Sequence, residues 1–264
     1  MKKVVLGIFA HPDDCEFMCA GTLTLLYQKG WSVYIATMTP GDKGSNDLPR
    51  RDISEIRKKE AGKSARLIQG IYRCLGFEDL FIFYDRDTIC KTTKLIRDVR
   101  PDIVFTASPN DYMIDHEITS HIVETACFSS GISNLELNKE PYEPVPYLFY
   151  CDPLEGKDKF GNLVIPKINV DITELMPNKE KMLSCHVSQA KWLKEHHGVD
   201  QYSVLMKDLA LMRGKEINVR YAEGFRQHLG HSFPSGNILR EILGDLVVVN
   251  QDELITVNHS NSHK

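Results

Sequence analysis

Short apolar runs alternate with longer amphipathic segments along the first half of the chain. Three of the runs have the length and composition of buried strands, at residues 4–9, 31–38 and 102–107. Four segments have the pattern of helices, or end at a helix-breaking Gly or Pro, at residues 17–29, 52–69, 87–100 and 117–128. This alternation predicts an α/β fold with a doubly wound, mostly parallel sheet and helices on both faces.

The second half of the chain has weaker periodicity. Two strands are predicted at 147–151 and 168–172, a long helix at 173–196 and another helix at 201–215. No Gly/Ser-rich linker or change in composition divides the sequence, so we expect a single domain over residues 1–264 with a C-terminal elaboration. The polar tail, about residues 258–264, is predicted to be disordered.

The densest group of polar residues directly follows the first predicted strand. His11, Asp13, Asp14 and Glu16 lie within six residues, and burying that much charge costs several kcal/mol unless the groups are paired or hold a cation. Neutral imidazole and carboxylate groups are typical of catalytic zinc sites, which have three protein ligands and a fourth position for water. Because neighbouring side chains diverge, one aspartate can bind the metal while the other acts as a base. The alternative is an ordinary helix N-cap formed by Asp13 or Asp14.

A second polar loop follows the predicted strand at 102–107, and it carries Asp111, Asp115 and His116. In a doubly wound sheet the ligand site lies beyond the carboxyl ends of the strands, where the strand order reverses. The two polar loops are therefore expected to form the two walls of one crevice. We predict His116 as the third metal ligand, and the alternative is a surface histidine at the start of a helix.

Composition and charge disfavour several other classes of protein. Apolar residues make up 42% and charged residues 26% of the chain, and the formal net charge is −4 without a conspicuous basic run, so no nucleic-acid partner is expected. No apolar run approaches the ~18 residues of a membrane span, so no membrane partner is expected either. The seven cysteines are scattered and form no Cys-x-x-Cys pair, which is typical of reduced, buried thiols and favours a cytoplasmic location.

The motifs of the first half resemble those of the LmbE/PIG-L family of zinc-dependent N-acetylglucosaminyl deacetylases. Five stretches match in order: Ala10-His11-Pro12-Asp13-Asp14-Cys15-Glu16, Gly41-Asp42-Lys43-Gly44, Arg57-x-x-Glu60, Arg100-Pro101-Asp102 and Asp115-His116. A weaker match is Tyr221-Ala222-Glu223-Gly224-Phe225. The resemblance implies a Rossmann-like fold and zinc-dependent removal of an acetyl group from an N-acetylated amino sugar or its conjugate.

The resemblance also implies roles for individual residues. It makes His11, Asp14 and His116 the Zn²⁺ ligands and Asp13 the general base. Arg57 and Asp79 match positions at which the family holds the sugar. The implied partner is a small-molecule amino-sugar substrate, and assembly into a homo-oligomer is a further expectation.

One position departs from the family pattern. Where the family has His-Pro-Asp-His, this chain has Met113-Ile114-Asp115-His116. Methionine cannot give the hydrogen bond or proton that the histidine supplies to the oxyanion or the leaving amine. His186, His228 and His231 are candidates for the missing group, and we predict His228 as a second catalytic residue.

Two other functions stay open on the sequence alone. A metal-containing sugar-binding protein without turnover is possible because Met113 replaces the motif histidine; it would bind zinc and sugar and release no acetate. The other is a nucleotide-binding α/β enzyme with a magnesium site. Against it, no Gly-x-Gly-x-x-Gly or Gly-x-x-x-x-Gly-Lys-Ser/Thr motif follows the first strand, and histidine is an unusual ligand for magnesium.

Overall fold

The structure is a computed structural model that describes residues 3–197 and 202–250. Its strands are β1 (Val4–Phe9), β2 (Ser32–Thr37), β3 (Ile71–Cys74), β4 (Ile103–Thr106), β5 (Tyr147–Cys151), β6 (Ile168–Asp171), β7 (Ala222–Gln227) and β8 (Val247–Val249). Its helices are α1 (Asp14–Gln28), α2 (Arg50–Arg66), α3 (Arg86–Val99), α4 (Ile114–Ser129), α5 (Met176–Leu183), α6 (Val187–His197), α7 (Tyr202–Glu216) and α8 (Ile238–Leu243). Short 3₁₀ turns lie at Leu154–Gly156, Thr173–Leu175 and Gly244–Leu246.

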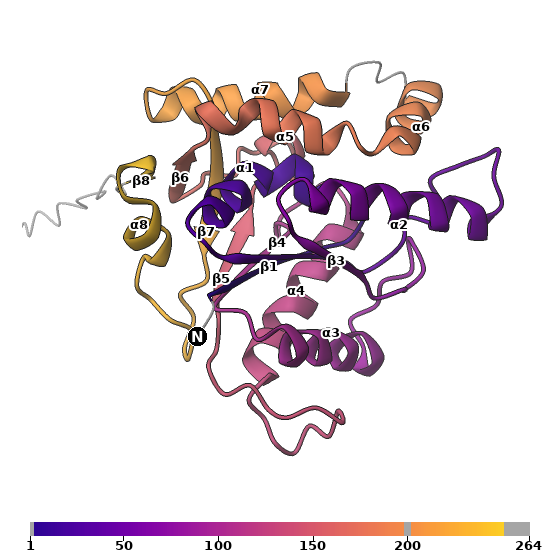
Figure 1. Cartoon of the computed structure of the whole chain (residues 1–264), viewed down its shortest axis with the longest axis vertical. Coiled ribbons are helices and arrows are strands. Elements are labelled where there is room, and N and C mark those ends of the chain that lie inside the picture. The colour runs from indigo at the N-terminus through magenta and orange to yellow at the C-terminus, as the bar shows by residue number, and fades with distance from the viewer. Residues whose placement is uncertain (1–2, 198–201, 251–264) are drawn as a thin grey trace, which may run out of the picture.

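Within the described residues the eight strands form one sheet in the order β3-β2-β1-β4-β5-β7-β6-β8 (Figure 1). The strands from β1 to β5 are parallel to one another, whereas β7 is antiparallel to β5 and β6, and β8 is antiparallel to β6. The chain passes from β1 outward to β2 and β3 and then crosses to β4 on the other side of β1, so the strand order reverses between β1 and β4. The predicted doubly wound, mostly parallel sheet with a C-terminal elaboration is confirmed.

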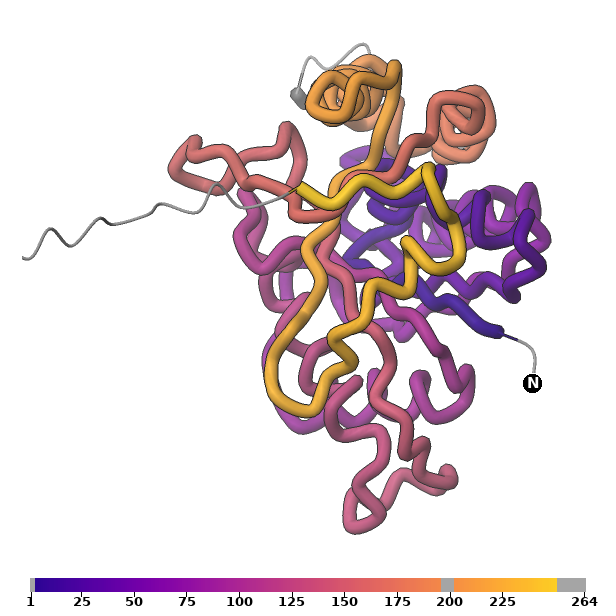
Figure 2. The backbone as a smooth tube through the Cα atoms, turned by 90° about the vertical axis from the view of Figure 1, so that its left-hand side faces the viewer, coloured from indigo at the N-terminus to yellow at the C-terminus, as the bar shows by residue number. Residues whose placement is uncertain are grey.

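Helices cover both faces of this sheet. Figure 1 shows α1, α2 and the later helices α5, α6 and α7 on one face, and α3 and α4 on the other. Strand β1 contributes to both cores because its side chains alternate: Val5 and Phe9 pack on the α1 side, and Leu6 and Ile8 on the α4 side. Figure 2 shows the C-terminal segment with α8 and β8 along one side of the molecule, where β8 pairs with β6 at the edge of the sheet.

Two helices begin one turn earlier than the sequence pattern predicts. α1 begins at Asp14 rather than at residue 17, and α4 begins at Ile114 rather than at residue 117. Acidic residues in these first turns, among them Asp14 and Asp115, suit the positive end of the helix dipole. As a result, both polar motifs end in helices whose first turns fix their side chains.

The second half contains the larger errors of prediction. The helix expected at 173–196 is two helices, because Ser184 ends α5 and His186 turns inward against Glu16 of α1. β3, β7 and β8 are not predicted by the apolar pattern. In β7 the pattern is hidden because the buried Glu223 is paired with Lys179 at 2.5 Å, so a charged residue occupies a core position. The tail at 258–264 lies outside the described residues.

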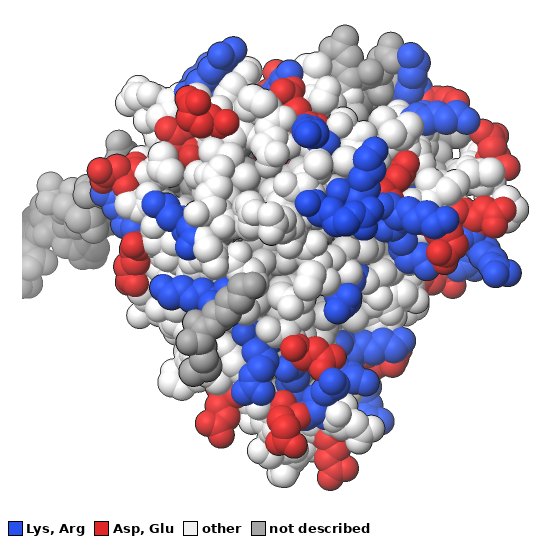
Figure 3. Space-filling view, in the orientation of Figure 1, with Lys and Arg blue, Asp and Glu red and all other residues white. Residues whose placement is uncertain are grey.

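Charged side chains of both signs lie on the face shown in Figure 3, where Lys and Arg gather over α2 and acidic side chains lie beside them. Ion pairs such as Lys58–Glu55, at 2.5 Å, partly neutralise this surface. The absence of a nucleic-acid partner stays a prediction. Among the described residues, no helix combines the length and apolar character needed to cross a bilayer.

Candidate metal centre

The loops after β1 and β4 meet at the point where the strand order reverses. There the structure brings together two imidazoles and four carboxylates, all at most 7% exposed, and we call this group the metal cluster: His11, Asp14, Asp79, Asp111, Asp115 and His116. Asp79 comes from the loop after β3, and the other members come from the two loops and the first turns of α1 and α4. The two polar loops therefore meet as predicted, and both motifs contribute residues to the cluster.

Asp14 lies between the two imidazole rings. Its Oδ2 atom is 3.5 Å from Nδ1 of His11 and its Oδ1 atom is 3.4 Å from Nε2 of His116. One ligand atom from each of these three residues lies within 4.8 Å of the other two. Two imidazoles and one carboxylate at this spacing are the donor set of a catalytic zinc site, so the residues fit the metal that the sequence implies.

The second nitrogen of each ring faces another carboxylate. Nε2 of His11 is 3.0 Å from Oδ1 of Asp79 and 3.3 Å from Oδ2 of Asp115. Nδ1 of His116 is 3.1 Å from Oδ1 of Asp111. Metal-binding histidines in proteins are held by such second partners, which fix the tautomer and the ring orientation. His11, Asp79 and Asp115 also lie close enough together to hold a cation, but the set with two imidazoles suits zinc better.

Backbone groups hold the outer carboxylates in turn. Asp115 accepts a hydrogen bond from the Leu80 N–H at 2.9 Å, and Asp111 accepts one from the Met113 N–H at 3.1 Å. The Asp79 N–H donates to Asp42 at 2.9 Å. Backbone hydrogen bonds thus hold these outer aspartates in place without a bound ligand.

The carboxylates set the protonation state of the rings. Burial by itself lowers the pKa of His11, but the hydrogen bonds to Asp115, Asp14 and Asp79 outweigh it and hold that pKa well above its usual value. For His116, burial also lowers the pKa, while the charge of Asp14 and the hydrogen bond to Asp111 raise it to about 10. Without a metal, both rings are therefore protonated at neutral pH.

Zinc binding is expected to release protons. A ring must be neutral to bind a metal, so zinc should displace roughly two protons at pH 7, one from each imidazole, and its apparent affinity should rise with pH until His116 titrates at about 10. Calorimetric titration of the metal-free protein with Zn²⁺, in buffers of different ionisation enthalpy, measures this release. Binding without proton release would contradict the pairing of these rings with the carboxylates.

Asp13 stands apart from the ligands. It is at the N-cap position of α1 with φ 104°, a left-handed conformation rare for a residue with a side chain, and that side chain makes no cap hydrogen bond. Instead Oδ2 accepts a hydrogen bond from the Tyr202 hydroxyl at 2.7 Å, and Oδ1 is 3.3 Å from Nη2 of Arg57. Burial raises the pKa of Asp13, although Arg57 lowers it. The alternative, in which the side chain of the motif aspartate caps the helix, therefore does not explain the contacts of Asp13.

Arg57 contacts Asp13, and Asp79 contacts His11. Arg57 is buried, and its guanidinium also donates to the backbone oxygens of Pro12 and Gly41. A Cβ atom at Gly41 would lie 2.4 Å from Arg57, so only glycine allows this approach. Asp79 lies against His11 as described above. The sugar contact implied for these two residues stays a prediction.

The structure separates the three candidate histidines. His228 lies beside Leu148 of β5, its ring bonds the Tyr150 hydroxyl at 2.9 Å and packs on Phe233, and none of these partners belongs to the metal cluster. These contacts do not support the predicted place of His228 in the site, because β7 is antiparallel to β5 and its end carries His228 away from the carboxyl edge of the sheet. His228 as a second catalytic residue stays a prediction. His231 is exposed.

Of the three candidate histidines, His186 is the one that interacts electrostatically with Asp13. It is buried, its Nε2 atom is 3.3 Å from Oε1 of Glu16, and its charge lowers the pKa of Asp13. It can therefore influence Asp13, although its ion-pair partner is Glu16 and not a member of the metal cluster.

Sequence reasoning missed two contributors to the site. The role of Asp111 as the partner of His116 was detectable, because it precedes that histidine by five residues in the same loop. Tyr202 was not detectable, because it reaches Asp13 across 189 residues of sequence and no motif surrounds it.

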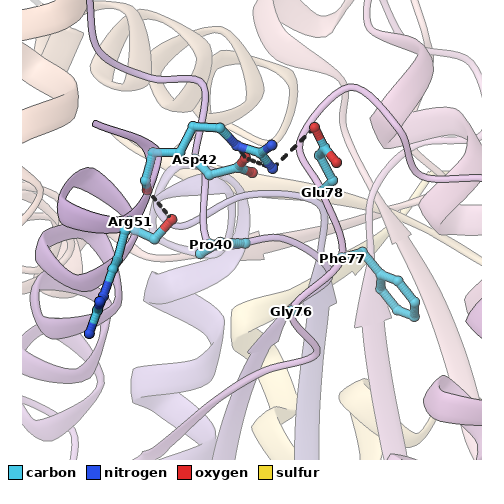
Figure 4. A pocket seen from close by; sticks show the side chains of 8 residues that line it. Pro40, Asp42, Arg51, Gly76, Phe77 and Glu78 are labelled. Atoms are coloured by element: carbon cyan, nitrogen blue, oxygen red, sulfur yellow. Dashed lines mark hydrogen bonds and ion pairs between the residues drawn. The ribbon is translucent and has the colours of Figure 1, made fainter. Parts of the chain in front are cut away.

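A hollow of about 490 Å³ lies beside the metal cluster. Asp42 lines it and bonds the backbone of Asp79, so the hollow adjoins the cluster from outside. Figure 4 shows Asp42 and Glu78 at the hollow, with ion pairs between the drawn residues, while the side chains of Arg51 and Phe77 point away.

Comparison with known proteins agrees with this geometry. The family model described as PIG-L, GlcNAc-PI de-N-acetylase, matches residues 6–127. A Bacillus cereus protein named "probable N-acetyl-alpha-D-glucosaminyl L-malate deacetylase 2" is 30% identical over 205 residues, which cover 74% of this chain and 87% of that protein.

Solved structures share the fold. The N,N'-diacetylchitobiose deacetylase of Pyrococcus horikoshii matches with a TM-score of 0.74 and 29% identity, covering 89% of this chain and 88% of that chain. A 4-carboxy-2-hydroxymuconate hydratase of Pseudomonas putida has the same TM-score of 0.74 at 19% identity, covering 89% and 99% of the two chains, and that likeness shows the fold alone. By its motifs, its metal cluster and its Bacillus cereus relative, the chain belongs to the PIG-L (LmbE-like) family.

Proposed function

We propose that this protein is a zinc-dependent amide hydrolase that removes an acyl group, in the simplest case acetyl, from an N-acetylated amino sugar or its conjugate. One observation carries the proposal: two buried imidazoles share one carboxylate, each ring is backed by another, and a separate buried aspartate stands beside them. Membership of a family whose relatives are named deacetylases supports the reaction class.

His11, Asp14 and His116 are the residues that would hold the metal. When bound, zinc supplies Lewis acidity, which polarises the amide carbonyl and makes water more acidic. The chain supplies the orientation of the ligands, because Asp79, Asp115 and Asp111 fix the two rings.

Asp13 is proposed as the general base. It would accept a proton from water as the water oxygen adds to the amide carbon, and then pass that proton to the departing nitrogen, which leaves as the amine. Its raised pKa brings the carboxylate closer to the working pH of such a base. Arg57 and Tyr202 are positioning residues that hold its two oxygens, and Asp79 positions His11 in addition to the sugar contact predicted for it.

A cytoplasmic location is part of the proposal. It rests on the seven cysteines, all of which are free in the structure.

Acetate release tests the function directly. The zinc-loaded protein should release acetate from N-acetylglucosamine or one of its glycosides, and a chelator should abolish this release, with recovery when Zn²⁺ is added back. Release that persists after complete chelation would contradict the metal-dependent mechanism. If the protein binds zinc and the glycosides but releases no acetate from any of them, it is the binding protein that Met113 also allows.

A further inference from the structure

Large apolar side chains are exposed around the mouth of the metal cluster. Six of them, each between 51% and 80% exposed, form what we call the apolar rim: Leu80, Phe81, Phe83, Tyr112, Ile114 and Phe160. They come from the segments that follow β3, β4 and β5. These segments lie at the carboxyl edge of the parallel strands, which is also where the cluster lies. Exposed apolar groups gathered in this way mark binding surfaces rather than ordinary protein surface.

The apolar rim is joined to the metal cluster by direct contacts. The ring of Tyr112 packs edge-on against His116, with centroids 5.6 Å apart. The backbone N–H of Leu80 donates to Asp115, and Ile114 is the residue before Asp115. A substrate whose amide reaches His116 would therefore lie close to Tyr112.

Further contacts hold the rim segments in place. The rings of Phe81 and Phe83 are 6.3 Å apart. The segment that carries Phe160 is tied to the first turn of α4 by an ion pair between Lys159 and Glu117 at 2.7 Å. The rim is thus a surface fixed by its neighbours, as a specificity site requires.

Three cations near the rim, Lys43, Arg50 and Lys159, are paired with carboxylates. Lys43 lies 2.6 Å from Glu78, and Arg50 lies 2.7 Å from Asp42 and 3.1 Å from Glu78, at the hollow of Figure 4. Lys159 pairs with Glu117 as described above. An anionic substituent on the substrate would compete with these carboxylates for the cations, whereas a neutral apolar group would bury the rim without breaking an ion pair.

We infer that the substrate carries a neutral apolar group, aromatic or aliphatic, next to its N-acetylated sugar, and that the apolar rim binds this group. The inference rests on the proposed function and narrows its substrate class. The inferred substrate differs from the malate conjugate in the name of the Bacillus cereus relative. Malate carries carboxylates, whereas the apolar rim offers apolar side chains.

Three glycosides of N-acetylglucosamine with the same anomeric configuration test the inference: methyl, benzyl and carboxymethyl. Their dissociation constants are measured by calorimetry on the zinc-loaded protein, and initial rates are measured wherever acetate is released. The benzyl glycoside should bind about tenfold or more tightly than the methyl glycoside, since a ring that loses its contact with water gains at least that much. The carboxymethyl glycoside should bind no more tightly than the methyl glycoside.

Two variants make the test specific. Phe81→Ser should remove most of the benzyl preference, which is the ratio of the methyl-glycoside to the benzyl-glycoside dissociation constant in the same variant. Phe128→Ser removes an equally exposed ring, 50% against 51%, from the far end of α4 and should leave this ratio unchanged. Light scattering of wild type and Phe81→Ser shows whether a second copy of the chain covers the rim instead; a wild-type oligomer that this variant dissociates would overturn the inference.

The remaining outcomes separate the two proposals. Three results would contradict a role of the apolar rim in binding and would leave the proposed hydrolase function unaffected. They are equal binding of the benzyl and methyl glycosides, tighter binding of the carboxymethyl glycoside, and a benzyl preference that survives in Phe81→Ser. If no glycoside binds at all, the proposed amino-sugar substrate is wrong, and the inference about its apolar group is wrong as well.

Discussion

Replacement of Asp13 by asparagine should reduce acetate release by about 10³-fold while the protein keeps its zinc, because general-base catalysis by a placed side chain contributes ~10²–10⁴ in rate. Asparagine has the shape of aspartate, its amide oxygen can still accept a hydrogen bond from Arg57, and its NH2 group can donate to the Tyr202 hydroxyl, so the fold should survive. Turnover on an N-acetylated glycoside, zinc content by elemental analysis and thermal unfolding are measured together. A fully active Asp13→Asn enzyme would refute the base assignment.

A milder variant, at the hydrogen-bond partner of Asp13, tests whether Asp13 acts as a base. Tyr202→Phe removes the hydroxyl that donates to Asp13 at 2.7 Å, and that hydrogen bond lowers the pKa of the carboxylate. Without it the pKa of Asp13 rises further. A base works only when deprotonated, so the acidic limb of the kcat/KM profile should move to higher pH. A merely structural role of Tyr202 would lower the rate without moving this limb.

Most of the metal cluster could be predicted because its parts are local and the topology is regular. His11 and Asp14 belong to one short motif, and the rule that parallel strands end at one edge brings His116 beside them across more than 100 residues of sequence. The first turns of α1 and α4 then fix the side chains. Motif and topology together therefore position the ligands without any knowledge of the loops between them.

Other residues of the site could not be predicted, because their partners are distant and unmarked. Tyr202 follows a weakly periodic region, and its contact with Asp13 depends on where α7 packs. The contacts of His228 could not be predicted for a related reason. The apolar pattern does not reveal β7 as a strand, since its buried Glu223 is neutralised by Lys179 and by the backbone N–H groups of Gly21 and Thr22 in α1. Without β7, the antiparallel pairing that places His228 beside Leu148 of β5 cannot be predicted.

We expect the wild type to bind about one zinc ion per chain and His116→Ala to lose nearly all of it, because a three-ligand site cannot lose an imidazole and keep its affinity. His231→Ala is the matched control, since His231 is an exposed histidine on a loop after β7; it should bind zinc as the wild type does. Thermal unfolding of the metal-free forms shows whether His116→Ala is folded. A folded variant that retains the wild-type zinc content would place the metal elsewhere.

Asp79→Asn should weaken zinc binding, but by less than His116→Ala does. Asp79 contacts Nε2 of His11 at 3.0 Å, and partners of this kind tune a metal site by about 10- to 100-fold in affinity rather than creating it. Zinc affinity, measured by competition with a chelator, should therefore fall in the order wild type, Asp79→Asn, His116→Ala. If Asp79→Asn instead lost more zinc than His116→Ala, the metal would lie among His11, Asp79 and Asp115, the second group that the structure allows. The ranking of the two variants thus decides between two arrangements that share one histidine.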